Sequence, residues 1–214
     1  MSTQIKEGVT ATQSEIRESL RLRGFVLFKS VIDPALLENA KVKAWETIAT
    51  YDKELQQIES KGDLPYCLPM KVNDHIPLLD HAEALLRSIG ADPYWLQNLM
   101  LIMKQPHEGR RFWHTDNPPI FAPSEEDAPE LFVLYFLQKT TVKNGALLVV
   151  PGYAEGPQHS ERVTTPIEGE YPIETEMGDV IVFDPRLLHG SMANNTDEHR
   201  FNVRLWIQTN WKDK

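Results

Sequence analysis

The chain has 214 residues, of which 41% are hydrophobic and 25% charged, values that fit one soluble globular domain with a sizeable core. The formal net charge of −9 argues against non-specific binding to DNA or RNA. The single cysteine, Cys67, excludes an intrachain disulfide, and no apolar run approaches a membrane span or a secretion signal. We therefore expect a cytoplasmic protein without a nucleic-acid or membrane partner.

Residues 1–98 carry mostly helical patterns. Thr12–Glu15 has the sequence of a capping box, in which a Thr and a Glu three residues later bond each other's backbone. It predicts a short amphipathic helix that ends near Gly24. The expected apolar side of this helix consists of Ile16, Leu20 and Leu22. Residues 24–28, GFVLF, are expected to form a strand directly after it.

Two longer helices are expected before residue 98. Asp33-Pro34 combines a good N-cap residue with a proline at the first helical position, which predicts a helix from there to about Lys61. Its apolar stripe consists of Leu37, Ala40, Trp45, Ile48, Leu55 and Ile58. Residues 78–89 predict a further helix, which ends at Gly90.

Residues 99–214 have the pattern of short strands separated by turns. The apolar runs of strand length are 101–104, 132–138, 146–152 and 178–184. In residues 200–209, RFNVRLWIQT, polar and apolar residues alternate, which indicates a strand with two different faces. The polar face consists of Arg200, Asn202, Arg204, Trp206 and Gln208. Such a face points either to solvent or, in a small barrel or jelly roll, into a ligand cavity.

These patterns predict a mainly β fold with flanking helices, in one domain that spans 1–214. A small barrel or jelly roll would be built from 99–214, with the helices of 1–98 packed outside it. Between two strands, residues 117–130 contain four prolines and four acidic residues, which excludes a helix or a central strand. A loop of this length is either a lid or partly disordered, and its place directly after FWHTD favours a lid.

The stretch 112–116, FWHTD, has a histidine and an aspartate two residues apart at an expected strand end. Residues i and i+2 of a strand point to the same side, so His114 and Asp116 project together. Taken alone, H-x-D is more often an ordinary strand end than a metal site. His189, which follows the strand of 178–184, is a third potential ligand that would meet the pair across the barrel. Two imidazoles and one carboxylate form the ligand set of non-haem iron(II) oxygenases.

Arg200 lies eleven residues after His189. This spacing lets the chain leave one strand at His189, turn, and return antiparallel at Arg200. An arginine there is suited to a dicarboxylate, because its planar guanidinium donates two parallel hydrogen bonds to a carboxylate. The sequence thus offers a candidate metal triad, a candidate carboxylate clamp and a polar strand face.

These motifs resemble the phytanoyl-CoA dioxygenase family of iron(II)- and 2-oxoglutarate-dependent oxygenases. The matching stretches are WHTD (113–116), NGALLVVPG (144–152), GDVIVFD (178–184), HGSMANNTDEHR (189–200) and GFVLFKSVIDPALLENA (24–40). The stretch 189–200 is the most specific, because a serine, an asparagine and an arginine follow its histidine at the family's spacing. The chain departs from the family at PGYAEGPQHS (151–160), where members commonly have P-G-S-H.

The resemblance implies a fold, cofactors and site residues. The fold would be a double-stranded β-helix, a cupin-like jelly roll, and the cofactors would be iron(II), 2-oxoglutarate and dioxygen. Iron would be held by His114, Asp116 and His189. Arg200 would bind the distal carboxylate of 2-oxoglutarate with support from Ser191. Halogenating relatives have Gly or Ala in place of Asp116, so this carboxylate favours hydroxylation.

Six further residues are candidates for contact with a substrate: Lys104, Trp113, Asn117, Tyr135, Asn202 and Arg204. Arg204 shares the polar face with Arg200, so it is either a substrate ligand or a salt-bridge partner. Arg204 and Lys104 suggest an anionic or amino-acid-like substrate, whereas the acidic segment 117–130 suggests a cationic one. The sequence leaves the identity of the substrate and the oligomeric state open.

The predicted function is the hydroxylation of a C–H bond in a small-molecule metabolite, with release of succinate and carbon dioxide. One alternative is a cupin-like metal-dependent isomerase or a dioxygenase that does not use 2-oxoglutarate. Another is a jelly roll that binds a ligand without catalysis. Succinate release coupled to loss of 2-oxoglutarate would distinguish the predicted function from the first alternative. Titration with iron(II) would distinguish it from the second.

Overall fold

The computed structural model describes residues 11–55, 67–116, 130–152 and 162–209, and the strands in these ranges form two antiparallel sheets. The large sheet consists of β1 (Phe25–Phe28), β8 (Val180–Phe183), β5 (Glu130–Phe136), β10 (Arg200–Thr209), β3 (Tyr94–Lys104) and β2 (Cys67–Pro69), in this spatial order. The small sheet consists of β4 (Arg111–His114), β9 (His189–Ser191), β6 (Leu147–Val149) and β7 (Tyr171–Ile173).

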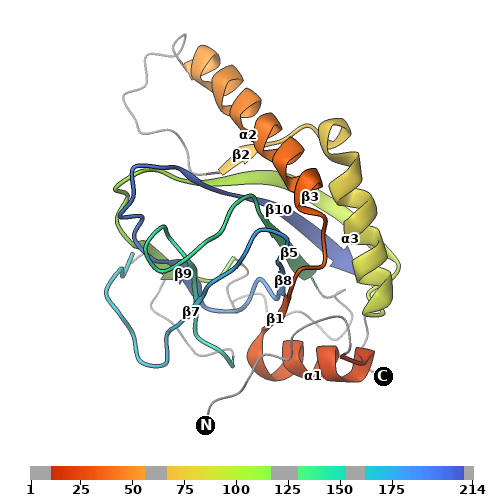
Figure 1. The fold of residues 1–214 in the computed structure, drawn as a ribbon. Coiled ribbons are helices and arrows are strands. Elements are labelled where there is room, and N and C mark those ends of the chain that lie inside the picture. The colour runs from red at the N-terminus through yellow and green to blue at the C-terminus, as the bar shows by residue number, and fades with distance from the viewer. Residues whose placement is uncertain (1–10, 56–66, 117–129, 153–161, 210–214) are drawn as a thin grey trace.

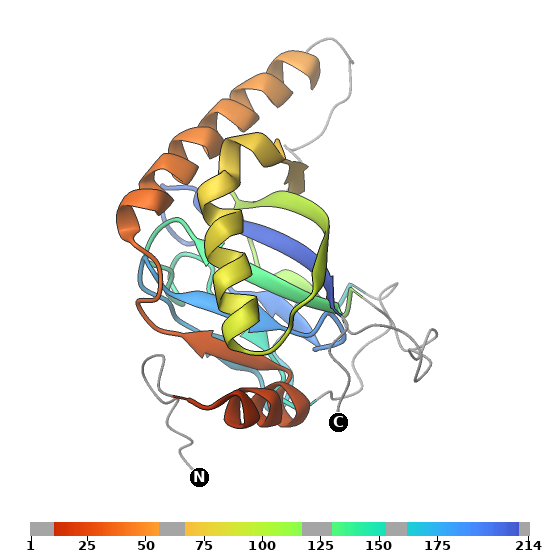
Figure 2. The ribbon, with the colours of Figure 1, turned by 90° about the vertical axis from the view of Figure 1, so that its right-hand side faces the viewer.

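The helices lie on the outside of the large sheet. They are α1 (Gln13–Arg23), α2 (Pro34–Leu55), the short 3-10 helix η1 (Val72–His75) and α3 (Ile76–Ser88). In the ribbon views α2 and α3 cover one face of the sheet and α1 lies beside β1 (Figures 1 and 2). The main core fills the space between these helices and the apolar face of β10, as predicted. No helix in the described part of the chain combines the length and apolarity needed to span a membrane.

The capping box predicted at the start of the N-terminal helix is present in the structure. The backbone N–H of Glu15 donates to Thr12 Oγ1 at 3.3 Å, and the N–H of Thr12 donates to the Glu15 carboxylate at 2.8 Å. Gly24 ends the helix with φ of 82°, a left-handed conformation that favours glycine. The prediction of Leu22 as a core residue is wrong, because this side chain is 52% exposed.

The second helix also begins where the sequence predicts. Asp33 Oδ1 accepts a hydrogen bond from the backbone N–H of Ala35 at 2.9 Å, which satisfies one donor of the first turn. Leu37, Ala40 and Ile48 of the predicted stripe are buried. Trp45 differs, since it remains 45% exposed and places its ring edge-on against the rings of His199 and Phe201. The Leu55 side chain and the expected continuation through Ile58 to Lys61 lie outside the described residues.

The strands agree with the sequence where they are long and apolar. β10 has the predicted bounds, and it pairs with β3 over its whole length, which extends β3 back to Tyr94. The short strands β2, β7 and β9 were not predicted, because each has only three residues and is defined by its pairing with neighbouring strands rather than by an apolar run of its own. The segment 117–129, which contains Asn117 and most of the expected lid, lies outside the described residues.

One expected connection is wrong. β9 pairs with β4 and β6 in the small sheet, whereas β10 pairs with β3 and β5 in the large one. The chain therefore changes sheets between Ser191 and Arg200 instead of returning beside the strand that it left. Apolar residues of β1, β5 and β8 pack against Val149 and Ile173 of the small sheet. The two sheets thus face each other as a jelly roll, with the polar face of β10 on the inside.

The two faces of β10 can be tested with a matched pair of substitutions. Leu205 is fully buried against the helices, so Leu205→Ala is expected to lower the free energy of unfolding by about 2–5 kcal/mol. Leu22→Ala removes the same atoms at an exposed position and is expected to cost less than about 0.5 kcal/mol. Urea unfolding at equilibrium measures both values. Similar losses for the two variants would contradict this assignment of inside and outside.

Candidate metal centre

A cavity of about 540 Å³ lies between the two sheets. The large sheet lines it with Ile102, Leu134, Phe136, Phe183, Arg200, Asn202 and Arg204. The small sheet lines it with Arg111, Phe112, His114, Leu147, His189, Gly190 and Ser191. The sequence left two directions open for the polar face of β10, and its residues Arg200, Asn202 and Arg204 point into the cavity, since all three line this wall.

The three residues of the predicted triad come together at this cavity. Potential ligand atoms of His114, Asp116 and His189 all lie within 4.8 Å of one another. His114 on β4 and His189 on β9 are cross-strand partners, and their ring centroids are 4.2 Å apart. Asp116 follows β4, and its backbone N–H donates to the carbonyl of Pro185 at 2.9 Å. The expectation that His189 lies across the barrel is therefore wrong, since it sits on the adjacent strand of the same sheet.

Backbone hydrogen bonds orient both imidazoles. Nδ1 of His114 lies 3.0 Å from the carbonyl of Phe112, and Nδ1 of His189 lies 2.9 Å from the carbonyl of Leu187. A carbonyl only accepts, so Nδ1 carries a proton in each ring and Nε2 is the nitrogen left to face a ligand. Nε2 of His189 is 3.4 Å from Asp116 Oδ2. An imidazole nitrogen and a carboxylate oxygen at this distance can share a proton or a metal ion, and a backbone carbonyl behind Nδ1 is the arrangement of metal-binding histidines.

The carboxylate of Asp116 completes this arrangement. Burial by itself would raise its pKa, but the contact with His189 and the charges of His189, His114 and Arg204 outweigh that effect and lower the pKa to about 2. Its Oδ2 is buried and has no hydrogen-bond partner among the described residues. An ionised, unsatisfied carboxylate beside two oriented imidazoles fits a divalent cation.

Arg200 forms a second unsatisfied group in the same cavity. The residue is buried, and its Nε and Nη1 have no hydrogen-bond partner among the described residues. Burial lowers the pKa of this guanidinium to about 9, with a further lowering by the charge of Arg111. Buried donors on a cation are costly without an acceptor, so this position fits an anionic ligand that enters the cavity.

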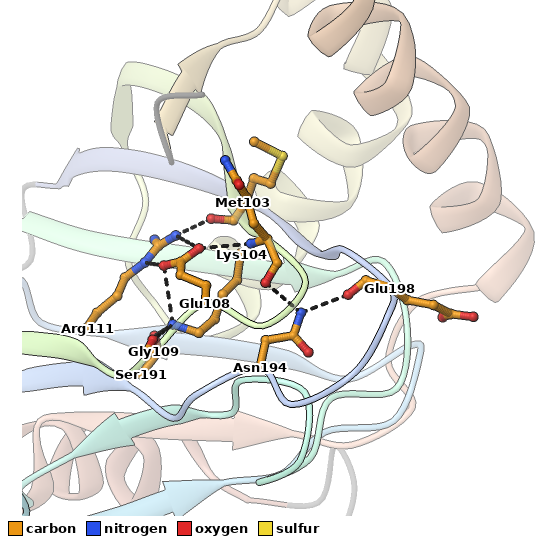
Figure 3. Close-up of polar contacts among 9 residues, drawn as sticks. Met103, Lys104, Glu108, Gly109, Arg111, Ser191, Asn194 and Glu198 are labelled. Carbon is orange, nitrogen blue, oxygen red and sulfur yellow. Dashed lines mark hydrogen bonds and ion pairs between the residues drawn. The ribbon is translucent and has the colours of Figure 1, made fainter. Parts of the chain in front are cut away.

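Ser191 lies beside this position and is held by Lys104. Lys104 is fully buried, and its Nζ donates to Ser191 Oγ at 3.2 Å, to the carbonyl of Gly109 at 2.7 Å and to Glu108 at 3.3 Å (Figure 3). An ammonium has no lone pair, so Ser191 Oγ accepts in this bond and keeps its own proton for another acceptor. Lys104 therefore does not line the cavity, but it holds Ser191, which does.

The same close-up shows two residues that the sequence did not single out. Arg111 donates from Nε to Glu108 Oε1 at 2.8 Å, and its Nη2 donates to the carbonyl of Met103 (Figure 3). Strand alternation would place Arg111 and His114 on opposite faces, but the pairing of β4 with β9 is irregular between them. Both therefore line the cavity, and no sequence pattern reveals the irregularity. Glu108 is the one carboxylate among three cations, Lys104, Arg111 and Arg200.

Asn194 fixes the turn that carries the chain from β9 to β10. Its Nδ2 donates to the carbonyl of Gln105 at 2.9 Å and to the carbonyl of Glu198 at 2.7 Å (Figure 3). These bonds hold the connection against the segment that follows β3. The asparagine of the 189–200 motif thus helps to place His189 and Arg200 on facing sheets.

Besides Lys104, two further predicted substrate residues do not line the cavity. Trp113 is buried on the other side of β4, where its indole N–H donates to the carbonyl of Thr165 at 3.0 Å. Tyr135 faces α3, and its hydroxyl lies 3.0 Å from His81 Nδ1. Burial raises the pKa of this tyrosine well above its usual range. Asn202 and Arg204 do line the cavity.

The fold and this cluster define a jelly-roll protein with a mononuclear metal centre, and sequence comparison places it in a family. The family model of phytanoyl-CoA dioxygenase (PhyH) matches residues 20–202, so the chain belongs to this family. A similar curated relative is dioxygenase aneA of Aspergillus aculeatus, which is 31% identical over 134 residues. This match covers 60% of the chain and 45% of the relative, so the chain spans less than half of that protein's length.

Solved structures share the fold at low sequence identity. AviO1 from Streptomyces viridochromogenes Tue57 superposes with a TM-score of 0.70 at 19% identity, over 100% of this chain and 99% of that one. The epimerase SnoN, in complex with Fe3+, alpha ketoglutarate and nogalamycin RO, has a TM-score of 0.65 at 16% identity. That alignment covers 92% of this chain and 83% of SnoN. The same jelly roll thus occurs in an enzyme that does not hydroxylate as its named reaction.

The burial of Lys104 predicts a pH dependence of stability. Burial lowers the pKa of Lys104 in the folded protein to about 8, while the unfolded chain keeps the usual value of 10.5. Between these two values the unfolded state binds more protons, so this residue makes the free energy of unfolding rise with pH. Lys104→Met removes the contribution. Urea unfolding of both proteins from pH 7.5 to 10.5 should show the wild type gaining stability relative to the variant, and parallel curves would contradict the prediction.

Proposed function

We propose that this protein is an iron(II)- and 2-oxoglutarate-dependent oxygenase that hydroxylates a C–H bond of a small molecule. The observation that carries the proposal is one cavity that holds both unsatisfied groups on its facing walls. The triad offers three ligand atoms within 4.8 Å, and the buried guanidinium of Arg200 offers donors without an acceptor. Membership of the phytanoyl-CoA dioxygenase family and the iron and alpha ketoglutarate bound in SnoN support it.

His114, Asp116 and His189 would hold the iron. Two imidazoles and one carboxylate would bind the metal and leave positions open for cosubstrate and dioxygen. The backbone carbonyls of Phe112 and Leu187 keep both rings in the required tautomer. Because Asp116 supplies a carboxylate, no position is vacated for a halide, and this favours hydroxylation over halogenation.

Arg200 and Ser191 would bind the distal carboxylate of 2-oxoglutarate. Nε and Nη1 of Arg200 are buried donors without an acceptor among the described residues, and a carboxylate beside this guanidinium would supply one. Ser191, whose oxygen already accepts from Lys104, would donate a further hydrogen bond. The surrounding cations favour this anion further, since Glu108 is the one carboxylate within their network.

When bound, iron(II) and 2-oxoglutarate supply oxygen activation coupled to oxidative decarboxylation of the cosubstrate to succinate and carbon dioxide. The chain orients the reacting C–H bond and keeps water out. Leu134, Phe136 and Phe183 provide the apolar wall for this purpose. They come from neighbouring strands of the large sheet and face the metal centre.

Two variants should separate metal binding from cosubstrate binding. His189→Ala is expected to abolish iron(II) binding in an anaerobic calorimetric titration, because it removes one of three ligands. Arg200→Gln should keep iron(II) affinity within about twofold but weaken 2-oxoglutarate at least tenfold, since it removes a charged hydrogen-bonding pair.

Arg110→Gln is the matched control. Arg110 also lines the cavity, but Glu170 binds its guanidinium through two hydrogen bonds, so both affinities should stay unchanged. Iron(II) binding by the His189 variant at wild-type affinity would refute the metal assignment. Wild-type 2-oxoglutarate affinity in the Arg200 variant would refute the clamp.

The reaction type is tested by the mass of the product. The iron-loaded protein is incubated with 2-oxoglutarate and a metabolite library, and succinate formation identifies substrates. Hydroxylation predicts a product heavier than its substrate by one oxygen atom, which labelled dioxygen supplies. A product of unchanged mass would indicate epimerisation, and loss of two hydrogens would indicate ring closure or desaturation. Turnover without succinate would favour a reaction that does not use 2-oxoglutarate.

A further inference from the structure

Arg204 is a cation in the cavity that neither the metal centre nor the cosubstrate site uses. It lies on β10, four residues after Arg200 on the same face, and lines the cavity. Its Nη1 is 3.7 Å from Asp116 Oδ2, which is beyond hydrogen-bond distance. Its Nε is buried and has no hydrogen-bond partner among the described residues. The guanidinium therefore lies beside the metal centre with a buried donor, Nε, that lacks an acceptor.

The orientation of this guanidinium is fixed by an aromatic ring. Cζ of Arg204 lies 4.5 Å from the centroid of the Phe132 ring, within the range of a cation–π interaction. Phe132 is itself fully buried and packs edge-on against Phe183 and Trp206. The ring thus supports one side of Arg204 and leaves its hydrogen-bonding edge to the cavity. A preorganised planar donor of this kind suits a carboxylate.

The charges around the cavity give Arg204 one anionic neighbour, Asp116, which is 3.7 Å away and is also a candidate metal ligand. Five arginines line it, and the carboxylates in the lining are Glu108 and Asp116. Arg110 is paired with Glu170 at 2.6 Å and Arg111 with Glu108 at 2.8 Å, while Arg200 is assigned to the cosubstrate. Iron(II) and the dianion 2-oxoglutarate bring opposite charges of equal size. Asp116 would then be a metal ligand, and the positive charge of Arg204 stays without a hydrogen-bonded anion.

We propose that Arg204 binds a carboxylate of the substrate, so that the substrate is a carboxylic acid with an apolar body. This inference rests on the proposed function and adds the class of substrate. The apolar body would contact Ile102, Leu134 and Phe136, which line the cavity beside Arg204. Since Arg204 adjoins Asp116, the oxidised carbon lies within a few bonds of the carboxylate. The competing role for Arg204 is only to orient Asp116.

The test uses matched pairs of ligands on the anaerobic protein loaded with iron(II) and 2-oxoglutarate. The probes are a panel of aliphatic and aromatic monocarboxylic acids, each with its own primary amide, and binding is measured by calorimetry. Cosubstrate saturation keeps the acids away from Arg200. The wild type is expected to bind the best acid at least tenfold more tightly than its amide, which corresponds to one charged hydrogen-bonding pair.

Variants at Arg204 and Arg110 test whether Arg204 causes the preference for the acid over its amide. Arg204→Gln should abolish it, with the affinity for the amide unchanged. Arg204→Lys keeps a positive charge beside Asp116 but loses the planar fork, so the acid should bind several-fold more weakly than in the wild type. Arg110→Gln should keep the full preference, because Glu170 already binds Arg110.

Three results would overturn the proposal: no acid in the panel preferred over its amide by the wild type, a preference that survives in Arg204→Gln, or an acid affinity unchanged in Arg204→Lys. If Arg204 only orients Asp116, the Gln variant loses iron(II) affinity while Arg204→Lys binds the acid as the wild type does. Failure of the proposed function is distinct, because the wild type would then bind no iron(II) or 2-oxoglutarate before any acid is added.

Discussion

The structure depends on one strand, β10, being buried on both faces. Its apolar residues pack against the helices that cover the large sheet, and its polar residues lie in the cavity between the sheets. A half-buried strand could leave its polar face in water, but this one has a second sheet over it. Every charged group on that face therefore needs a partner inside the protein. Among the described residues, Nε and Nη1 of Arg200 and Nε of Arg204 have no acceptor, and this is why the cavity is best explained as a binding site.

The small sheet serves a different purpose. Its short strands β4 and β9 bring two histidines into direct register, and backbone carbonyls set the orientation of both rings. The carboxylate arrives from the segment that follows β4. The triad is thus built on one rigid sheet, while the residues suited to organic anions come from the facing sheet. This separation lets the substrate groups vary without disturbing the metal ligands.

The cluster of cations at the cavity carries a cost for the folded state. Lys104, Arg111 and Arg200 surround Glu108, and burial lowers the pKa of Lys104 and of Arg200. Such clusters are tolerated where a ligand supplies the missing negative charge. The jelly roll itself also occurs in a protein named as an epimerase, so the fold does not identify the reaction or the ligand, and the positions of these cations are the better guide to the ligand. Family membership indicates the type of chemistry, and the arginines of the cavity indicate that the ligands are anionic.

The sequence by itself determined the elements whose pattern is local. The alternation in 200–209 gave β10 and its two faces, the capping box gave α1, and the spacing of His114, Asp116, His189 and Arg200 gave the candidate site. Local patterns suffice there because side-chain direction follows the period of the strand. Tertiary structure alone decided that His189 pairs beside His114, that Tyr135 faces α3, and that Lys104 acts from behind Ser191. It also brought Arg111 into the cavity through an irregular pairing. These outcomes depend on which strands meet and in what register, and contacts between residues far apart in the chain settle both.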